Sequence, residues 1–259
     1  MEYSMRAIFV CDQNKTYSDF WETQARHMWS VFGMKSLLYY ISNEPEHTMF
    51  TSEYAEVKQI PVCTTSPVLI QALFAKWWFP GFETDDHILI CDIDCFLLSK
   101  PYVEMIRNET KLFHLATYDG DKVPGYYVAG TPAQLGEFFQ VDKYTSFEHF
   151  CQEVMKSDCV KKLDRGLVSI ESVNASPDWA YFCSEERYAQ VCSLAYHPEK
   201  NAKTLFPGAT NQRIDRATKS AYSPTRLSRS EYVDYHCPRP FGEHKDTILS
   251  ILRASGSDV

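Results

Sequence analysis

Strand-like and helix-like segments alternate along the first hundred residues of this 259-residue chain. Short apolar runs such as RAIFVCD (6–12) have the length of buried strands, whereas 65–79 places apolar side chains at helical spacing. We expect strands at 6–12, 35–42, 56–62 and 86–94, and helices at 16–33 and 65–79. This alternation predicts an α/β fold of the Rossmann-like kind, with a mostly parallel central sheet flanked by helices.

The second half of the chain is less regular. No internal repeat and no sharp change of composition divides it from the first half, so we predict one domain over 1–259 with an irregular C-terminal part. We expect strands at 111–119 and 124–130, helices at 131–140, 145–157, 184–192 and 246–254, and a polar, loop-like stretch at 198–230.

Turn and cap residues mark several of the expected helix ends. Ser18 is a candidate N-cap and Gly33 a candidate C-terminal stop for the helix at 16–33. Thr131, followed by Pro132 at the first helical position, is the expected N-cap of the helix at 131–140.

Charge and cysteine content limit the class of protein. A formal net charge of -8 argues against a nucleic-acid-binding surface, which needs a basic stripe. No apolar run approaches the ~20 residues that span a bilayer. Nine cysteines without a CxxC pair are typical of reduced thiols rather than of a disulfide framework. We therefore expect a soluble, cytoplasmic protein without a membrane span or a nucleic-acid partner.

Two carboxylates follow an apolar run in HILICDIDCFLL (87–98). On a strand, Asp92 and Asp94 would point to the same side because side chains alternate between faces. Two ionised carboxylates that close together repel each other unless a cation neutralises them. Mg²⁺ or Mn²⁺ accepts such oxygen ligands and keeps sites for water or phosphate, so this pair predicts a metal site. The other interpretation is a pair of solvated strand-end carboxylates.

Strand ends suggest where a ligand binds. Asp12 ends the first expected strand, and the pair at Asp92 and Asp94 lies at the end of the strand at 86–94. Ligands of open parallel sheets bind beyond the carboxyl ends of the strands. These acids are therefore expected near one crevice.

At this point the chain resembles the GT-A glycosyltransferases, which transfer a sugar from a nucleotide-sugar donor. ILICDIDCFLL resembles their DxD segment, and RAIFVCD lies where that family begins its nucleotide-binding half. LIQALFAKWWFPGF before the pair, YYVAGTPAQLGEFF after it and YVDYHCPRPF near the end extend the resemblance over most of the chain. The resemblance implies a GT-A fold, with a nucleotide-binding half at 1–100 and an acceptor half at 101–259.

The resemblance also implies ligands for Mn²⁺ or Mg²⁺. In that family the metal bridges the DxD motif and the diphosphate of the donor. Carried over, Asp94 would be the more direct ligand, Asp92 would contact the ribose or hold the metal through water, and His236 would be the third protein ligand. A lone histidine is more often structural, but His236 lies in a proline-bounded segment beside Asp234 and Arg239.

Cationic and aromatic side chains are candidates to bind the donor. Lys76, on the helix before the DxD segment, is one candidate for the diphosphate. A flexible basic loop that closes over the diphosphate is another, and it would be formed by Lys203, Arg213, Arg216, Lys219, Arg226 and Arg229. A solvated surface loop explains this stretch equally well. Asp12 is a candidate for the base or ribose, and Tyr17 for stacking on the base.

PDWAYFCSEERY (177–188) is the best candidate for a catalytic acidic motif. It loosely resembles the acidic pair that the family places under the acceptor, and the pair here is Glu185 with Glu186. Asp178 is the rival for the role of general base. Carboxylates stabilised by a helix N-terminus are the alternative interpretation of each. Asp119, Tyr127, Ala129, Gly130 and Trp179 are candidates to line a pocket for a glycan or glycoconjugate acceptor.

Three other functions are consistent with parts of this pattern. A haloacid-dehalogenase-type phosphatase would use Asp92 as nucleophile and Asp94 as general acid, but that family prefers Thr or Val where this chain has Phe96. A non-catalytic nucleotide-sugar-binding protein could keep the same metal site. A sugar-nucleotide nucleotidyltransferase ranks lower because no glycine-rich loop follows the first strand. The sequence leaves the sugar, the base, the acceptor, the stereochemical outcome and the oligomeric state open.

Overall fold

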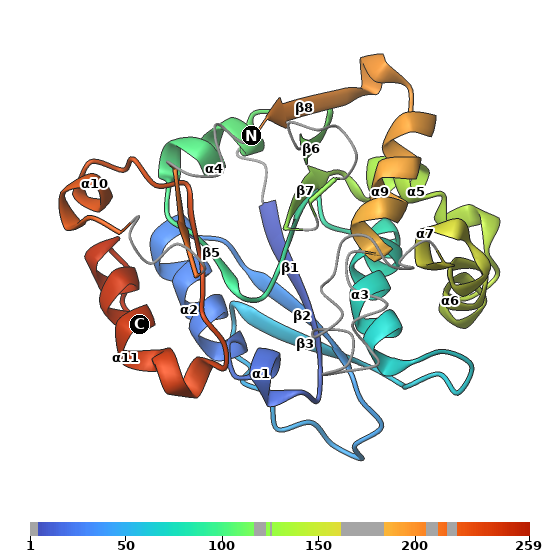
Figure 1. The fold of residues 1–259 in the computed structure, drawn as a ribbon, viewed down its shortest axis with the longest axis horizontal. Helices are drawn as coiled ribbons and strands as arrows, with labels where there is room; N and C mark the ends of the chain where they lie inside the picture. Colours follow the sequence, from blue (N-terminus) through green and yellow to red (C-terminus); the bar gives the residue numbers. More distant parts are fainter. Residues whose placement is uncertain (1–4, 117–122, 125, 162–183, 206–211, 217–221) are drawn as a thin grey trace.

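A seven-stranded sheet runs through the computed structural model, which describes residues 5–116, 123–124, 126–161, 184–205, 212–216 and 222–259. The strand order is β3-β2-β1-β4-β7-β6-β8 (Figure 1). Neighbouring strands are parallel except at β7, which is antiparallel to both β4 and β6. The strands are β1 (Met5–Asp12), β2 (Ser36–Ile41), β3 (Ala55–Ile60), β4 (His87–Cys91), β6 (Leu112–Ala116), β7 (Tyr127–Gly130) and β8 (Asn201–Leu205). The predicted α/β class with a mostly parallel sheet is confirmed.

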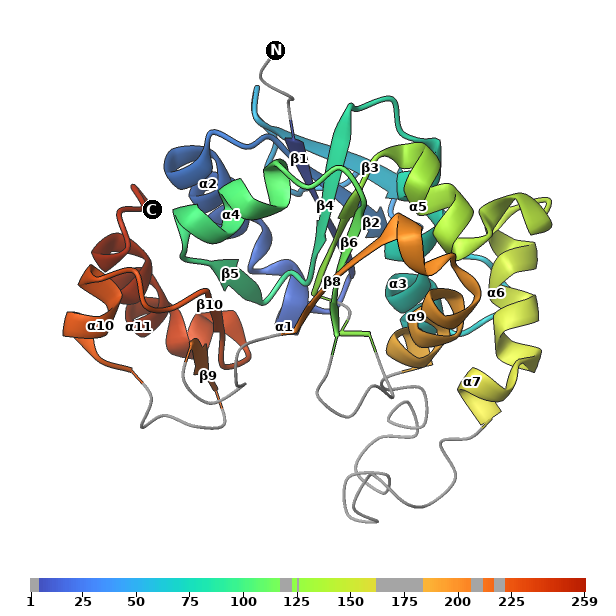
Figure 2. The same ribbon diagram turned by 90° about the horizontal axis from the view of Figure 1, so that it is seen from above.

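Helices cover both faces of this sheet (Figure 2). Side chains of β1 alternate between the two layers: Ala7, Phe9 and Cys11 pack in one hydrophobic core, and Ile8 packs in the other. The first core receives α2 (Trp21–Phe32), α4 (Lys100–Arg107) and α11 (Phe241–Ala254). The second receives α3 (Val68–Trp78), α5 (Pro132–Phe139), α6 (Phe147–Lys156), α7 (Asp158–Lys161) and α9 (Ser184–Ala195).

A second, three-stranded sheet lies against the first core. It has the order β5-β10-β9, with β5 (Cys95–Leu97), β10 (Asp234–His236) and β9 (Arg213–Asp215). β10 is antiparallel to β5, with His236 opposite Cys95, and parallel to β9, with His236 beside Asp215. This register brings the end of the chain next to the segment that follows β4.

Most expected elements are present, with different ends. Gly33 ends α2 in the left-handed conformation at φ 63°, as predicted. Thr131 caps α5 through a full capping box with Gln134, also as predicted. Ser18 is not an N-cap: it ends a short helix, α1 (Lys15–Ser18), which Asn14 caps. The expected helix at 16–33 is therefore two helices.

The prediction of a loop over 198–230 is wrong. Within it lie β8, β9, a 3-10 turn (Pro198–Lys200) and α10 (Pro224–Ser228), which Ser223 caps. The short strands escaped prediction because their polar side chains carry no apolar alternation. They form because neighbouring strands supply the hydrogen bonds. Two further 3-10 turns, Phe79–Phe82 and Val141–Lys143, follow α3 and α5.

A buried ion pair in the small sheet is hydrogen-bonded to the large sheet. Arg213 of β9 and Asp234 of β10 lie side by side in the register, and their charged groups are 2.8 Å apart. Tyr127 of β7 donates its hydroxyl to the same Asp234 carboxylate at 3.0 Å. Arg213 also stacks over the ring of Tyr126, 4.2 Å from its centroid. Asp234 is fully buried, so this pair fixes the small sheet against β7.

We expect Arg213→Met to destabilise the protein by about 3–5 kcal/mol, because it leaves the Asp234 carboxylate buried without its partner charge. Replacing both residues, Arg213→Met with Asp234→Leu, should recover much of that loss, since no lone charge remains. Denaturant unfolding measures both values. Arg226→Met is the control: Arg226 pairs with the more exposed Glu231, so its loss should cost about 1 kcal/mol or less. Equal effects of Arg213→Met and Arg226→Met would contradict this role.

Candidate functional site

A cavity of about 380 Å³ opens at the carboxyl ends of β1 and β4. The sheet order reverses between these two strands: β2 and β3 lie on one side of β1, and β4 lies on the other. Such a switch point is where open α/β sheets bind ligands. The cavity brings together most of the site residues predicted from sequence: Asp12, Tyr17, Lys76, Asp92, Asp94, Glu185, Glu186, Arg216 and His236.

The two DxD carboxylates lie in a turn and not on a strand. β4 ends at Cys91, and Asp92, Ile93 and Asp94 form the link to β5. The expectation that strand alternation places both acids on one side is therefore wrong, because the two residues are not part of a strand. Both still line the cavity, but each has its own cationic partner, Lys76 for Asp92 and Arg216 for Asp94.

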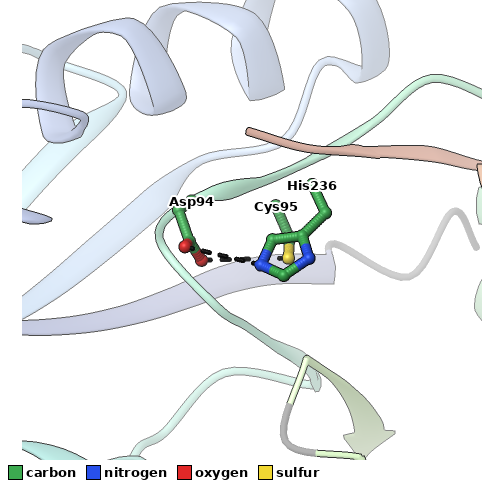
Figure 3. A group of neighbouring side chains, drawn as sticks. All are labelled: Asp94, Cys95 and His236. Carbon is green, nitrogen blue, oxygen red and sulfur yellow. Dashed lines mark hydrogen bonds and ion pairs between the residues drawn. The ribbon is translucent and has the colours of Figure 1, made fainter. Parts of the chain in front are cut away.

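Asp94 is the most heavily engaged carboxylate of the site. Its Oδ2 atom lies 3.0 Å from Arg216 Nη1, 3.4 Å from Arg239 Nε and 3.6 Å from His236 Nε2. Figure 3 shows His236 and Asp94 pointing toward each other, with Cys95 behind them. His236 is held from its other side by Asp215, whose Oδ2 is 3.2 Å from His236 Nδ1. The strand register of the small sheet produces this cluster.

Burial alone would raise the pKa of Asp94. The hydrogen bond to His236 and the charges of His236 and Arg216 outweigh burial, so the pKa of Asp94 is lowered. Asp94 is therefore an anion at neutral pH although only 5% of its surface is exposed. A buried carboxylate that stays ionised is a suitable ligand for a hard cation.

Asp94, Cys95 and His236 offer ligand atoms that all lie within 4.8 Å of one another. The 3.6 Å between Asp94 Oδ2 and His236 Nε2 suits two ligands of one ion, each bound at about 2.0–2.2 Å. Cys95 fits less well, because burial raises the pKa of its thiol well above the ordinary value and keeps it protonated. The donor set thus fits a divalent cation held by the carboxylate and the imidazole.

Lys76 links the DxD segment to α9. Its Nζ donates to Asp92 Oδ1 at 2.8 Å and lies 3.9 Å from Glu185 Oε1. Burial would lower the pKa of Lys76, but the charges of Asp92 and Glu185 outweigh burial and raise it. Lys76 is therefore a fixed positive charge in the wall of the cavity.

Glu185 lies in the first turn of α9 and is almost fully buried. Burial raises its pKa to about 7, with the charges of Glu186 and Asp92 acting in the same direction and Lys76 opposing them. Its Oε2 atom is buried and has no hydrogen-bond partner among the described residues. A carboxylate with a pKa near neutrality and one uncommitted oxygen can accept a proton from a bound hydroxyl.

The end of β1, the loop after it and α1 also line the cavity. Asp12 Oδ1 accepts the backbone N–H of Asn14 at 2.9 Å, and Asn14 in turn caps α1. Tyr17 of α1 has the Arg239 guanidinium 4.7 Å from its ring centroid, and Arg239 donates a short hydrogen bond to the Tyr17 hydroxyl. One side of the Tyr17 ring is therefore already occupied by Arg239.

Some predicted residues lie elsewhere. Arg213 is buried in its pair with Asp234 and does not line the cavity. Tyr127, Ala129 and Gly130 are buried in β7 and are not cavity-lining either. Of the stretch that was expected to be a basic loop, Arg216 alone among the described residues reaches the cavity. Asp178, Asp119, Trp179 and Lys219 lie outside the described residues.

Arg239, Asn14 and Tyr126 line the cavity but were given no role from the sequence. For Arg239 the available signal was its position three residues after His236. Asn14 follows Asp12 by two residues and is an N-cap type at the start of a helix. Nothing local marks Tyr126, which reaches the site because β7 lies next to β4.

No protein-family model matches the chain, and no curated protein matches it. Among the helices of the described part of the chain, none has the length and apolar content needed to cross a membrane.

Glu185→Gln should stabilise the protein above pH 7. The unfolded chain releases the Glu185 proton near pH 4.5, whereas the folded protein keeps it until about pH 7, so folded stability falls as the pH rises between these values. The amide removes this cost, which we expect to be of the order of 1–3 kcal/mol at pH 8 and close to zero below pH 4.5. Denaturant unfolding at several pH values measures it.

Glu243→Gln is the matched control, because Glu243 also lies in a first helical turn but is exposed. A stability gain of Glu185→Gln that does not change with pH would contradict the raised pKa of Glu185.

Proposed function

We propose that this protein is a metal-dependent glycosyltransferase that moves a sugar from a nucleoside-diphosphate sugar to a hydroxyl acceptor, with a glycan or glycoconjugate as the expected acceptor. The observation that carries the proposal is the convergence of DxD carboxylates, a late histidine, basic side chains and a near-neutral glutamate on one cavity at the switch point of the sheet. Each of these groups has a distinct task in such a transfer.

The charge of the cavity supports a divalent cation as part of the site. Five carboxylates line it, against three basic side chains apart from His236: Asp12, Asp92, Asp94, Glu185 and Glu186, against Lys76, Arg216 and Arg239. A diphosphate entering alone would meet a surplus of negative charge. When bound, Mn²⁺ or Mg²⁺ would neutralise the diphosphate and polarise it as a Lewis acid.

Asp94 and His236 would hold the cation, and Asp92 would reach it through water or contact the ribose. Asp92 is the more exposed of the two acids, with 34% of its side chain accessible, and it keeps Lys76 as a partner. Lys76 would place its fixed charge beside the diphosphate. Asp12, Asn14 and Tyr17 would face the nucleoside from β1, the β1–α1 loop and α1, since they line the cavity.

Glu185 is the proposed general base. The oxygen of the acceptor hydroxyl would attack the anomeric carbon of the sugar, and its proton would pass to the Glu185 carboxylate. The bond between that carbon and the diphosphate oxygen would break, and its electron pair would leave with the nucleoside diphosphate. A base with a pKa of about 7 is well matched to this transfer at neutral pH.

The state of Asp94 argues against the phosphatase alternative. A haloacid-dehalogenase-type enzyme needs the second acid of the motif as a proton donor. Asp94 is instead ionised, because its contacts to His236 and Arg216 lower its pKa. A group that holds no proton at neutral pH is poorly suited to general acid catalysis.

Thermal denaturation in the presence of UDP-, GDP- and TDP-sugars, with and without Mn²⁺, tests the donor class. We expect the nucleotide-sugars of one nucleobase to raise the melting temperature only when Mn²⁺ is present. A ligand that binds the folded state stabilises it by mass action, by about 2.7 kcal/mol at 100 times its dissociation constant. Asp94→Asn should abolish the shift. Asp142→Asn, an exposed acid outside the cavity, should keep it.

The proposal is wrong if no nucleotide-sugar shifts the melting temperature in the presence of any divalent metal ion. Tight binding of Zn²⁺ without nucleotide would identify a different metal site, and release of phosphate from generic phosphate esters would favour the phosphatase.

Glu185→Gln tests the base. We expect turnover to fall by ~10²–10⁴, the usual contribution of a general base, with little change in donor affinity. In the parent protein, activity should be lost below about pH 7, because a base must be deprotonated to act, and the variant should lose this pH dependence. Steady-state kinetics between pH 5 and 9 measure both. Unchanged turnover in Glu185→Gln would exclude Glu185, and a large loss in Glu186→Gln instead would move the role to its neighbour.

A further inference from the structure

Two guanidinium groups and an imidazole converge on a single oxygen atom of the cavity. Asp94 Oδ2 has Arg216 Nη1, Arg239 Nε and His236 Nε2 within 3.0 to 3.6 Å. This is the oxygen that faces the imidazole, so it is also the atom that would share a divalent cation with His236 (Figure 3). Two guanidinium groups therefore lie at the place where a metal has to bind.

These two arginines are held differently from Lys76. The Lys76 ammonium is 6% exposed and has carboxylates on two sides, Asp92 and Glu185. Arg216 and Arg239 are 26% and 19% exposed, and both side chains line the cavity. Their guanidinium groups can thus turn toward a ligand in the cavity while their backbones stay in place.

Each arginine has a contact that does not depend on Asp94. The N–H of Arg216 donates to the His236 carbonyl at 3.0 Å, directly after β9. Arg239 follows β10 and has a second contact, the ring and hydroxyl of Tyr17, that does not involve Asp94. Only the side-chain contacts to Asp94 need to be exchanged when a ligand binds.

A metal bound at Asp94 Oδ2 without an anion would lie against both guanidinium groups, and like charges at this distance repel each other. A diphosphate removes the conflict, because its several oxygens can accept paired, charge-assisted hydrogen bonds from both guanidinium groups. The diphosphate thus reduces the repulsion between the metal and the two guanidinium groups. The metal in turn reduces the repulsion between the diphosphate and the carboxylates of the cavity.

We infer that Arg216 and Arg239 are diphosphate-binding residues which, in the ligand-free protein, occupy the metal position at Asp94. Metal and nucleoside diphosphate therefore bind together, and each binds weakly alone. This inference rests on the proposed function. It assigns Arg239 a role in substrate binding and makes an unusual prediction: removing either arginine strengthens the binding of metal alone.

Titration of Mn²⁺, followed by the electron paramagnetic resonance signal of the free ion, tests this without any measurement of activity. The parent protein, Arg216→Gln and Arg239→Gln are each titrated alone and with saturating UDP or GDP. We expect each variant to bind Mn²⁺ alone about tenfold more tightly than the parent does, because a competing cation is gone. In the presence of the nucleotide, the variants should bind Mn²⁺ about tenfold more weakly.

The coupling between the two ligands gives a second readout. Because linkage is reciprocal, the factor by which the nucleotide tightens Mn²⁺ binding equals the factor by which Mn²⁺ tightens nucleotide binding. Isothermal titration of UDP or GDP with and without Mn²⁺ should give the same factor in the parent protein and a smaller one in both variants. Arg226→Gln, an arginine paired with Glu231 outside the cavity, should match the parent in every titration.

Unchanged or weaker binding of Mn²⁺ alone in both variants would overturn the inference. If the parent protein still binds Mn²⁺ and the nucleotide together, the proposed function survives that result. If no form of the protein binds Mn²⁺ even with UDP or GDP, the proposed function fails as well. Arg239→Met replaces Arg239→Gln if the glutamine variant does not fold, as judged by its thermal transition.

Discussion

The reversal of strand order between β1 and β4 determines where this protein can bind a ligand. β2 and β3 are added on one side of β1 and β4 on the other, so the loops after β1 and β4 leave the sheet in different directions. The space between those loops is the cavity. Asp12, the last residue of β1, and Asp92, the residue after β4, line it. Side chains from several elements meet there, as they do at the switch points of open α/β sheets.

The sequence predicts the parts of the site that local pattern determines. Asp12 and Asp92 end apolar runs, Lys76 lies on the helix before the second of these runs, and Glu185 begins a helix. Asp12 and Asp92 were expected near one crevice from their positions at strand ends, whereas Lys76 and Glu185 were candidates through the resemblance; all four line the same cavity. The general α/β fold was predictable for the same reason, since alternating strands and helices leave few ways to bury both faces of a sheet.

The remainder of the site depends on pairing between distant segments, which local pattern does not reveal. β5, β9 and β10 have three residues each. β5 is apolar but too short to be recognised from its pattern, and β9 and β10 have polar side chains that give no strand signal. Their register decides that Arg213 faces Asp234 in the interior, whereas Arg216, three residues later, reaches Asp94 in the cavity. From sequence, both arginines were equal candidates for a diphosphate, and only the pairing of β9 with β10 separates them.

The charged groups around Asp94 and those around Lys76 are balanced in different ways. Around Asp94, the contacts to Arg216 and His236 keep the carboxylate ionised, the state that the proposed function needs for a metal ligand. Around Lys76, burial together with the charges of Glu186 and Asp92 leaves Glu185 half protonated near pH 7, at a cost to folded stability. Both arrangements are poor for a protein that only has to fold, because the charges would be better satisfied by water. They are well suited to a cleft in which a cation, a diphosphate and a proton must all change partners during one reaction.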